Sequence, residues 1–209
     1  MEIQQRIFLA DRVALKSLGT LSQGLLLTRY RKEKTTPGSD DYRVVQPRDL
    51  DRLTIQSTEL ELERLVLPQT EGLFLLEGDV LITVKGAVQK ASVVDAATAG
   101  AIAVQNMAVF RVTPGLAVSV LPLYVAGLLR SEAFNPELSR LYRQSTGTRS
   151  ISLKQLGNVA IPLPSWERQQ ALAATFVALE RFALASERTV KARQTMVEQS
   201  LHTLLMEGQ

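Results

Sequence analysis

The stretch LKQLGNVAIPLPSWERQQ, residues 153–170, joins an apolar, strand-like run to a charged segment through two prolines and a serine. The prolines cannot continue a sheet ladder, and each favours extended geometry for the residue before it. Ser165 is a good N-cap residue, and Glu167 would then lie in the first turn, where a negative charge faces the positive end of a helix. The stretch therefore predicts that the chain leaves a strand and enters a helix at about Trp166.

The predicted helix is long, because no glycine or proline occurs between Trp166 and Gly208. A helix of that length would span roughly 60 Å at 1.5 Å per residue. Its apolar residues recur in steps of four, three or seven, which is the pattern of a heptad seam. Polar residues interrupt the seam at 186, 193 and 200. The seam residues, which we expect to form a dimer interface, are Leu172, Phe176, Leu179, Ala183, Val190, Val197 and Leu204.

An isolated helix of this length has no core of its own, so its seam predicts a second helix that covers it. The alternative is that the helix packs back on its own domain. The two readings give the same domain organisation, with a globular domain over residues 1–165 and a helical arm over residues 166–209.

The residues before the helix predict an α+β domain with a twisted, mostly antiparallel sheet. Residues 13–28 favour a strand and a turn, 37–42 a turn, and 44–50 a short strand that Pro47 ends. Residues 54–67 fit either a strand or a helix, and 76–95 predict a glycine-punctuated hairpin. Residues 106–112 predict a strand, 119–134 a helix that residues 136–142 extend, and 144–150 a polar loop. The run 151–164 is strand-like at both ends.

Composition favours binding over catalysis. The chain has no cysteine and one histidine, His202, which excludes disulfides, cysteine nucleophiles and a histidine cluster. Asp40 and Asp41 fall in the predicted turn, and the acidic residues at 59, 61 and 63 alternate as solvated charges do, so no carboxylate pair is poised for acid–base work. We therefore expect no catalytic residues, no metal site and no cofactor.

Targeting signals are also absent. No window approaches the ~18 apolar residues of a membrane span. The start MEIQQRIFLADR carries Glu2 where a secretory signal would be basic. We expect a cytoplasmic protein without a membrane segment.

The net charge of +3 is unevenly distributed. Five basic and five acidic residues balance within 167–209, so the whole excess lies in residues 1–166, where an anionic partner would bind. Three clusters there could contact DNA phosphates or bases, although each also fits a solvated surface loop. The candidate DNA-binding residues are Arg29, Arg31, Lys32, Lys34, Lys85, Lys90, Thr146, Thr148 and Arg149. A phosphate-cradling GxxxxGK[ST] motif is absent, which argues against an NTPase.

The segment SISLKQLGNVAIPLPSWERQQALAATF resembles the end of a target recognition domain in the DNA-specificity (S) subunits of type I restriction-modification systems. The resemblance lies in an extended stretch with two prolines and in a glutamate and a glutamine pair that open a long helix. These positions are Ile161, Pro162, Leu163, Pro164, Glu167, Gln169 and Gln170. Three further stretches agree in order: VALKSLGTLSQG, LLEGDVLITVKGAVQKASVV and AVQNMAVFRV.

The resemblance implies a non-catalytic domain that docks on a short sequence of double-stranded DNA, joined to a helix that forms an antiparallel coiled coil. In that family the coiled coil spaces two recognition domains and binds methyltransferase (M) subunits, which flip out an adenine, and restriction (R) subunits join the assembly. This chain carries one recognition domain and one helix, about half of the usual length. A homodimer through the helix would restore the full arrangement and would read a symmetric, split site.

Two other functions remain open at this point. A coiled-coil adaptor would bind protein through its globular domain instead of DNA. A small hydrolase or transferase would need a site that the residue types do not reveal.

Overall fold

The computed structural model describes residues 11–31, 40–56, 60–67, 72–86, 88–116, 119–145 and 148–207, and of residues 143–145, 148 and 202–207 it describes the backbone but not the side chains. Contacts divide the chain into two compact units, Met1–Ala173 and Ala174–Gln209. Each unit is described by itself. The structure confirms an α+β fold with mostly antiparallel sheets and a long C-terminal helix.

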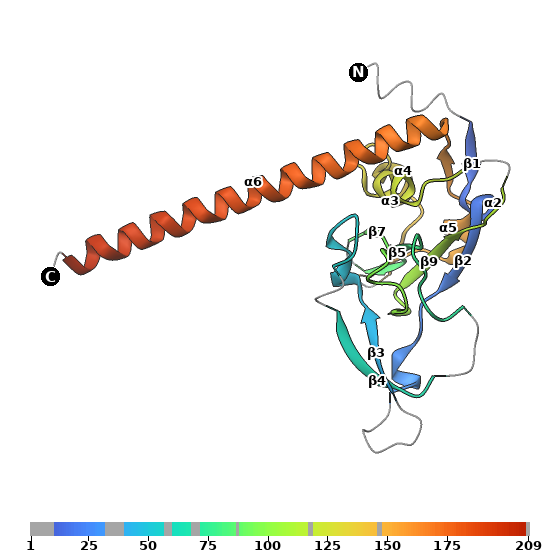
Figure 1. Cartoon of the computed structure of the whole chain (residues 1–209), viewed down its shortest axis with the longest axis horizontal. Coiled ribbons are helices and arrows are strands. Elements are labelled where there is room, and N and C mark those ends of the chain that lie inside the picture. The colour runs from blue at the N-terminus through green and yellow to red at the C-terminus, as the bar shows by residue number, and fades with distance from the viewer. Residues whose placement is uncertain are drawn as a thin grey trace. The chain divides into compact units, whose positions relative to one another are not determined.

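A four-stranded antiparallel sheet forms the centre of the first unit, in the order β2-β9-β5-β7. Figure 1 shows β9, β5 and β7 side by side. All four residues of β5 are buried, which suits a strand with neighbours on both sides. The predicted hairpin over 76–95 and the predicted strand over 106–112 are confirmed. The four strands are β2 (Gly19–Gln23), β9 (Met107–Val112), β5 (Val80–Thr83) and β7 (Ala91–Val93).

A second sheet has the order β4-β3-β8 and contains β4 (Glu61–Leu65), β3 (Asp40–Val45) and β8 (Ile102–Ala103). The sequence allowed either a strand or a helix over 54–67, and the structure shows a strand, β4, within this range. The prediction of a turn over 37–42 was wrong for Asp40, Asp41 and Tyr42, because all three pair with β4 and Asp41 accepts a hydrogen bond from Arg64 at 2.8 Å. Residues 37–39 of that predicted turn lie outside the described residues.

A third sheet has the order β10-β11-β6, with β10 (Arg143–Ser145), β11 (Thr148–Ser150) and β6 (Lys85–Gly86). The prediction of a polar loop over 144–150 was wrong for residues 144, 145 and 148–150, because two short strands pair here and the second joins β6, while 146 and 147 lie outside the described residues. A polar composition does not prevent a strand whose neighbours supply the hydrogen bonds.

The helices of the first unit are short. The predicted helix over 119–134 begins only at Pro122, since a proline fits the first helical position and has no amide hydrogen to donate inside a helix. Residues 136–142 do not extend it, because a separate short helix forms there. Part of the strand-like run 151–164 is also a helix, which the Ser152 side chain caps. The elements are α2 (Leu15–Leu18), η1 (Leu27–Arg29), η2 (Pro47–Asp51), α3 (Pro122–Arg130), α4 (Asn135–Ser139) and α5 (Leu153–Gly157).

The stretch around the two prolines joins the end of the first unit to its beginning. Strand β12 (Ala160–Pro162) pairs antiparallel with β1 (Arg12–Ala14), the first strand of the described chain. The buried Tyr124 of α3 donates its hydroxyl hydrogen to the Pro162 carbonyl at 2.7 Å. The strand, the helix α3 and the start of the long helix are therefore joined at one place.

The long helix α6 (Trp166–Glu207) begins and ends where the sequence predicts. The Ser165 carbonyl accepts the first helical hydrogen bond, from the Gln169 amide at 2.9 Å. The pKa of Glu167 lies below its usual value because the carboxylate accepts hydrogen bonds from its own backbone and from the Ser165 hydroxyl. Within the described residues, no helix is both long and apolar enough to cross a membrane.

Candidate nucleic-acid interface

The β10-β11-β6 sheet brings together two of the predicted DNA-binding segments. Arg149 pairs with Gly86, and Ser150 pairs with Lys85, so the tip of the 80–93 hairpin and the 143–150 hairpin share one sheet. The Ile151 amide extends this pairing by donating to the Val84 carbonyl at 2.9 Å. Segments about 60 residues apart in the sequence thereby form one continuous surface.

The segments that build this sheet contain no acidic residue. Neither 80–94 nor 138–166 contains an aspartate or a glutamate. Their cations are Lys85, Lys90, Arg140, Arg143, Arg149 and Lys154. A surface that carries several cations and no acid of its own attracts polyanions. We name Lys85, Arg140, Arg149 and Lys154 the basic sheet cluster.

Arg149 is positioned by an aromatic ring and a carbonyl. Its guanidinium lies 5.6 Å from the centre of the Tyr142 ring and donates to the Ser139 carbonyl at 3.3 Å. Burial raises the pKa of Tyr142 to about 12, against the smaller opposing effects of its hydrogen bond to Thr83 and of the Arg149 charge. The Tyr142 hydroxyl donates to the Thr83 carbonyl at 2.6 Å, which fixes the ring. The Arg149 guanidinium therefore keeps donors for a phosphate while its stem is held in place.

Lys85 and Lys90 differ in their surroundings although both lie on the same hairpin. Lys85 is exposed on β6. The Lys90 ammonium donates to the Asp51 carboxylate at 2.5 Å and to the Pro47 carbonyl at 3.2 Å. The positive charge of Lys90 is thus largely compensated inside the domain, and Lys85 is the better candidate for a phosphate contact.

The basic run near residue 30 lies on another part of the domain. Arg29 is exposed at the end of η1. Arg31 pairs through two guanidinium nitrogens with Glu63, which raises the pKa of Arg31, and it bridges to Leu65 of the β4-β3-β8 sheet. The structure does not bring this run into the β10-β11-β6 sheet. Lys32, Lys34 and Thr146 lie outside the described residues, and the side chain of Thr148 on β11 is not described.

Three cations near this sheet were not predicted as site residues: Arg140, Arg143 and Lys154. Arg140 and Lys154 are exposed. The missed signal is the run of 29 residues between Glu137 and Glu167 with four cations and no acid. Counting charges in spatially paired segments, instead of in local clusters, would have found them.

Gln169, in the glutamine pair of the double-proline stretch, is a buried structural residue. Its side chain is 1% exposed, and its amide nitrogen donates to the carbonyls of Ser119 at 2.9 Å and Pro164 at 3.0 Å. Its amide oxygen accepts from the Leu121 amide at 2.9 Å. The start of α6 is therefore fastened to the segment that leads into α3.

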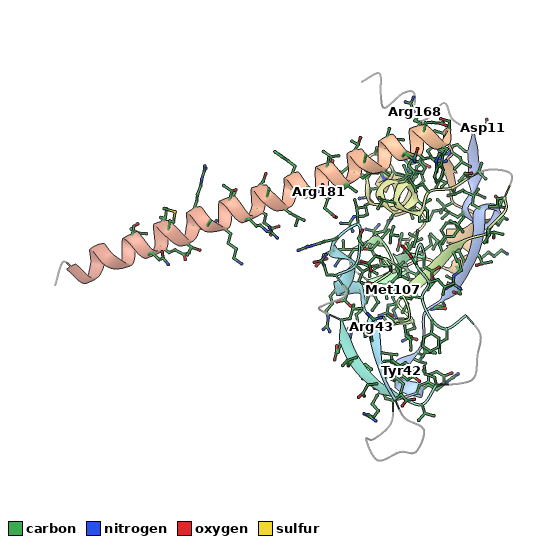
Figure 2. The ribbon with its side chains drawn as sticks, in the orientation of Figure 1. Asp11, Tyr42, Arg43, Met107, Arg168 and Arg181 are labelled. Atoms are coloured by element: carbon green, nitrogen blue, oxygen red, sulfur yellow. The ribbon has the colours of Figure 1, made fainter. Side chains whose placement is uncertain are left out.

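The predicted seam of α6 is largely exposed beyond Ala173. Leu172 and Phe176 are half-buried and Ala183 is exposed, while the side chain of Leu204 is not described. The exposed fractions are Leu179 60%, Val190 55% and Val197 59%. Three more apolar residues of this helix, Phe182 at 73%, Met196 at 67% and Leu201 at 54%, are exposed and were not predicted. Arg181, labelled on α6 in Figure 2, follows Phe176 by five residues, a spacing that assigns it to the outer side of the heptad.

Among the residues that the structure describes, no three histidine, aspartate or glutamate side chains gather in a way that could hold a metal ion.

Solved structures with this fold are type I restriction-modification specificity subunits. The HsdS subunit from Thermoanaerobacter tengcongensis matches 85% of this chain with a TM-score of 0.56 and 21% identity, over 39% of its own length. The S subunit from M. genitalium matches 87% with a TM-score of 0.52 and 16% identity, over 42% of its length. A structure described as the basis of complex assembly and conformational transition of the type I R-M system matches 90% with a TM-score of 0.62 and 20% identity, over 42% of that chain.

These likenesses define the class of the fold, which is that of a specificity subunit and agrees with the resemblance seen in the sequence. The chain spans about two fifths of the length of the solved structures that it matches. No family model matches the sequence, and no curated protein does.

Proposed function

We propose that this chain is a sequence-specific DNA-binding specificity subunit of a type I restriction-modification system. It is not an enzyme itself. It pairs with a second copy through α6, reads a bipartite site on double-stranded DNA, and positions methyltransferase subunits and restriction subunits on that DNA.

The observation that carries this proposal is the likeness of the fold to specificity-subunit structures. Between 85% and 90% of this chain aligns with them, over 39–42% of their own length. The aligned residues contain one domain and one long helix, and two copies related by a two-fold axis would place two of each on the DNA. A two-fold dimer reads an inverted repeat whose half-sites are separated by a fixed distance.

The basic sheet cluster supports DNA as the ligand of the first unit. Lys85 and Arg149 present donors without a carboxylate on their own strands, which suits the sequence-independent contacts that position a protein on phosphates. Base contacts would come from side chains that enter a groove beside these phosphate contacts.

Selection from a random duplex library tests the proposal. The purified chain, alone and with an adenine methyltransferase subunit, is mixed with random duplexes at low salt, and the bound duplexes are sequenced. We expect enrichment of two inverted half-sites at a constant spacing. Absence of salt-dependent binding to any duplex, with and without the methyltransferase subunit, would contradict the proposal and favour a protein-binding adaptor.

A further inference from the structure

The apolar residues of α6 complement the same helix run in the opposite direction. In the heptad, Phe176, Ala183, Val190 and Val197 occupy the first core position, a, and Leu179, Ser186, Arg193 and Ser200 occupy the second, d. The a position is apolar throughout, whereas the d position is polar from residue 186 onward. Such an uneven seam restricts how two copies can pair.

A parallel pair of these helices would be poorly matched. Each core layer of a parallel pair contains the same residue twice, so Arg193 would face its own copy and the two serine layers would be left as voids. Like charges in a core layer repel in a partly desolvated environment. An antiparallel pair removes both problems because each layer then joins an a residue to a d residue.

We propose one register for the antiparallel pair of α6 helices that the resemblance implies, with Val190 level with Ser186 of the second copy and the two-fold axis near Arg188. The proposal rests on the dimer of the proposed function and specifies it. In this register each core layer joins either a large residue to a small one, or two apolar residues to each other. The layers are Phe176 with Ser200, Leu179 with Val197, Ala183 with Arg193 and Val190 with Ser186.

The residues beside the core select this register over its neighbours. Phe182 and Met196, at 73% and 67% exposed, lie at position g, and g residues of antiparallel helices face each other. The proposed register places Phe182 opposite Met196 of the second copy. A slip by one heptad in either direction places Phe182 opposite Thr189 or Thr203 instead, and both apolar side chains then lose their apolar neighbour.

Arg193 also finds a suitable environment in this register. It is level with Ala183 of the second copy, the smallest apolar residue of the seam, which leaves space for its long stem. Phe182 of that copy lies next to Ala183, so the guanidinium can stack on its ring. The one unfavourable contact is between the two copies of Glu187 at the axis, and Lys191, four residues further along each helix, offsets it in part.

A distance measurement tests the register directly, and the chain suits it because it contains no cysteine. A spin label on Ala178→Cys lies on the exposed side of the full-length chain. In the proposed register Ala178 is level with Glu198 of the second copy, so pulsed dipolar spectroscopy should find two labels about 30 Å apart along the helix axis. A slip by one heptad changes this separation by about 10 Å. In a parallel pair the two labels would lie at the same level, with no separation along the helix axis. Either result overturns the register while leaving a dimer, whereas a monomer at micromolar concentration overturns the dimer as well.

Charge substitution provides a second, independent test. Ala183→Glu should tighten the dimer, by at least about threefold in its dissociation constant, since each new carboxylate meets Arg193 of the second copy. Ala183→Lys should weaken it by a similar factor, and Ala185→Glu, on the outer side of the heptad, should change little. Analytical ultracentrifugation measures the dissociation constant of the dimer for all three variants. Equal effects of Ala183→Glu and Ala183→Lys would show that Ala183 does not face Arg193, and would overturn the register.

Discussion

At the residue scale, the buried amide of Gln169 shows how the double-proline stretch determines the fold. The Gln169 side chain hydrogen-bonds one backbone amide, of Leu121, and two carbonyls, of Ser119 and Pro164. Its neighbour Gln170 is exposed and makes none of these contacts. The two glutamines look equivalent in the sequence and differ completely in the structure.

Replacing Gln169 should therefore destabilise the first unit. We expect Gln169→Leu to lower the free energy of unfolding by about 1–3 kcal/mol, because three partly buried backbone groups lose their side-chain partner. Urea denaturation measures this change, with Gln170→Leu as the matched control at under about 0.5 kcal/mol. Similar losses for both variants would show that the side-chain hydrogen bonds of Gln169 contribute little.

Two buried tyrosines predict weakened stability at alkaline pH. Burial raises the pKa of Tyr124 and of Tyr142 to about 12, whereas an unfolded tyrosine titrates near 10. The unfolded chain therefore loses protons first between pH 10 and 12, and stability should fall by up to about 1.4 kcal/mol per pH unit for each tyrosine. Below pH 10 these two tyrosines should not make the free energy of unfolding depend on pH. Urea midpoints from pH 8 to 11.5 test this, and Tyr142→Phe should flatten the slope by about half.

At the scale of elements, the basic sheet cluster depends on a strand pairing that joins β6 to β11. We expect Lys85→Ala and Arg149→Ala each to reduce the slope of log affinity against log salt concentration by about 0.9 on any duplex sequence. The control is Arg48→Ala, because Arg48 is exposed but pairs with Glu61 at 2.5 Å. Fluorescence anisotropy at several salt concentrations measures the slopes. Unchanged slopes for both cluster variants would move the DNA interface away from this sheet.

The sequence predicted elements well where local chemistry decides them. The start of α6 and the 80–93 hairpin follow from prolines, glycines and apolar periodicity, and all are observed. It failed for β10 and β11, whose polar residues form strands only because β6 supplies a partner. Local sequence also could not show that the Lys90 ammonium is paired, because its partner, the Asp51 carboxylate, lies 39 residues away. Strand pairing and ion pairs between residues far apart in the chain depend on the tertiary structure, which local sequence patterns do not encode.

At the scale of the whole molecule, the exposed seam of α6 should control the oligomeric state. Leu179→Glu introduces a charge into a core layer, so the variant should have half the mass of the wild type at micromolar concentration. Arg181→Glu, on the outer side of the same turn, should leave the mass unchanged. Sedimentation equilibrium measures both. A wild-type monomer would contradict the dimer, and an unaffected Leu179→Glu dimer would show that another surface forms it.

Loss of the dimer should also change DNA binding in a specific way. A monomeric Leu179→Glu chain retains the basic sheet cluster, so it should still bind a single half-site with a similar salt dependence. It should lose the additional affinity for a duplex that carries both half-sites, because the second contact is no longer intramolecular. Comparing one-half-site and two-half-site duplexes by anisotropy separates these effects.

The pairing of β1 with β12 has a consequence for biosynthesis. The Arg12 side chain donates to the Ala160 carbonyl across 148 residues, so β1 can complete its pairing only after β12 has been translated. Contacts between segments so distant form late in folding. The helix α6 is translated directly after β12, and we therefore expect each copy to complete its own domain at about the time its helix becomes free to find another. Translation order would thus favour assembly from finished domains over entanglement of nascent ones.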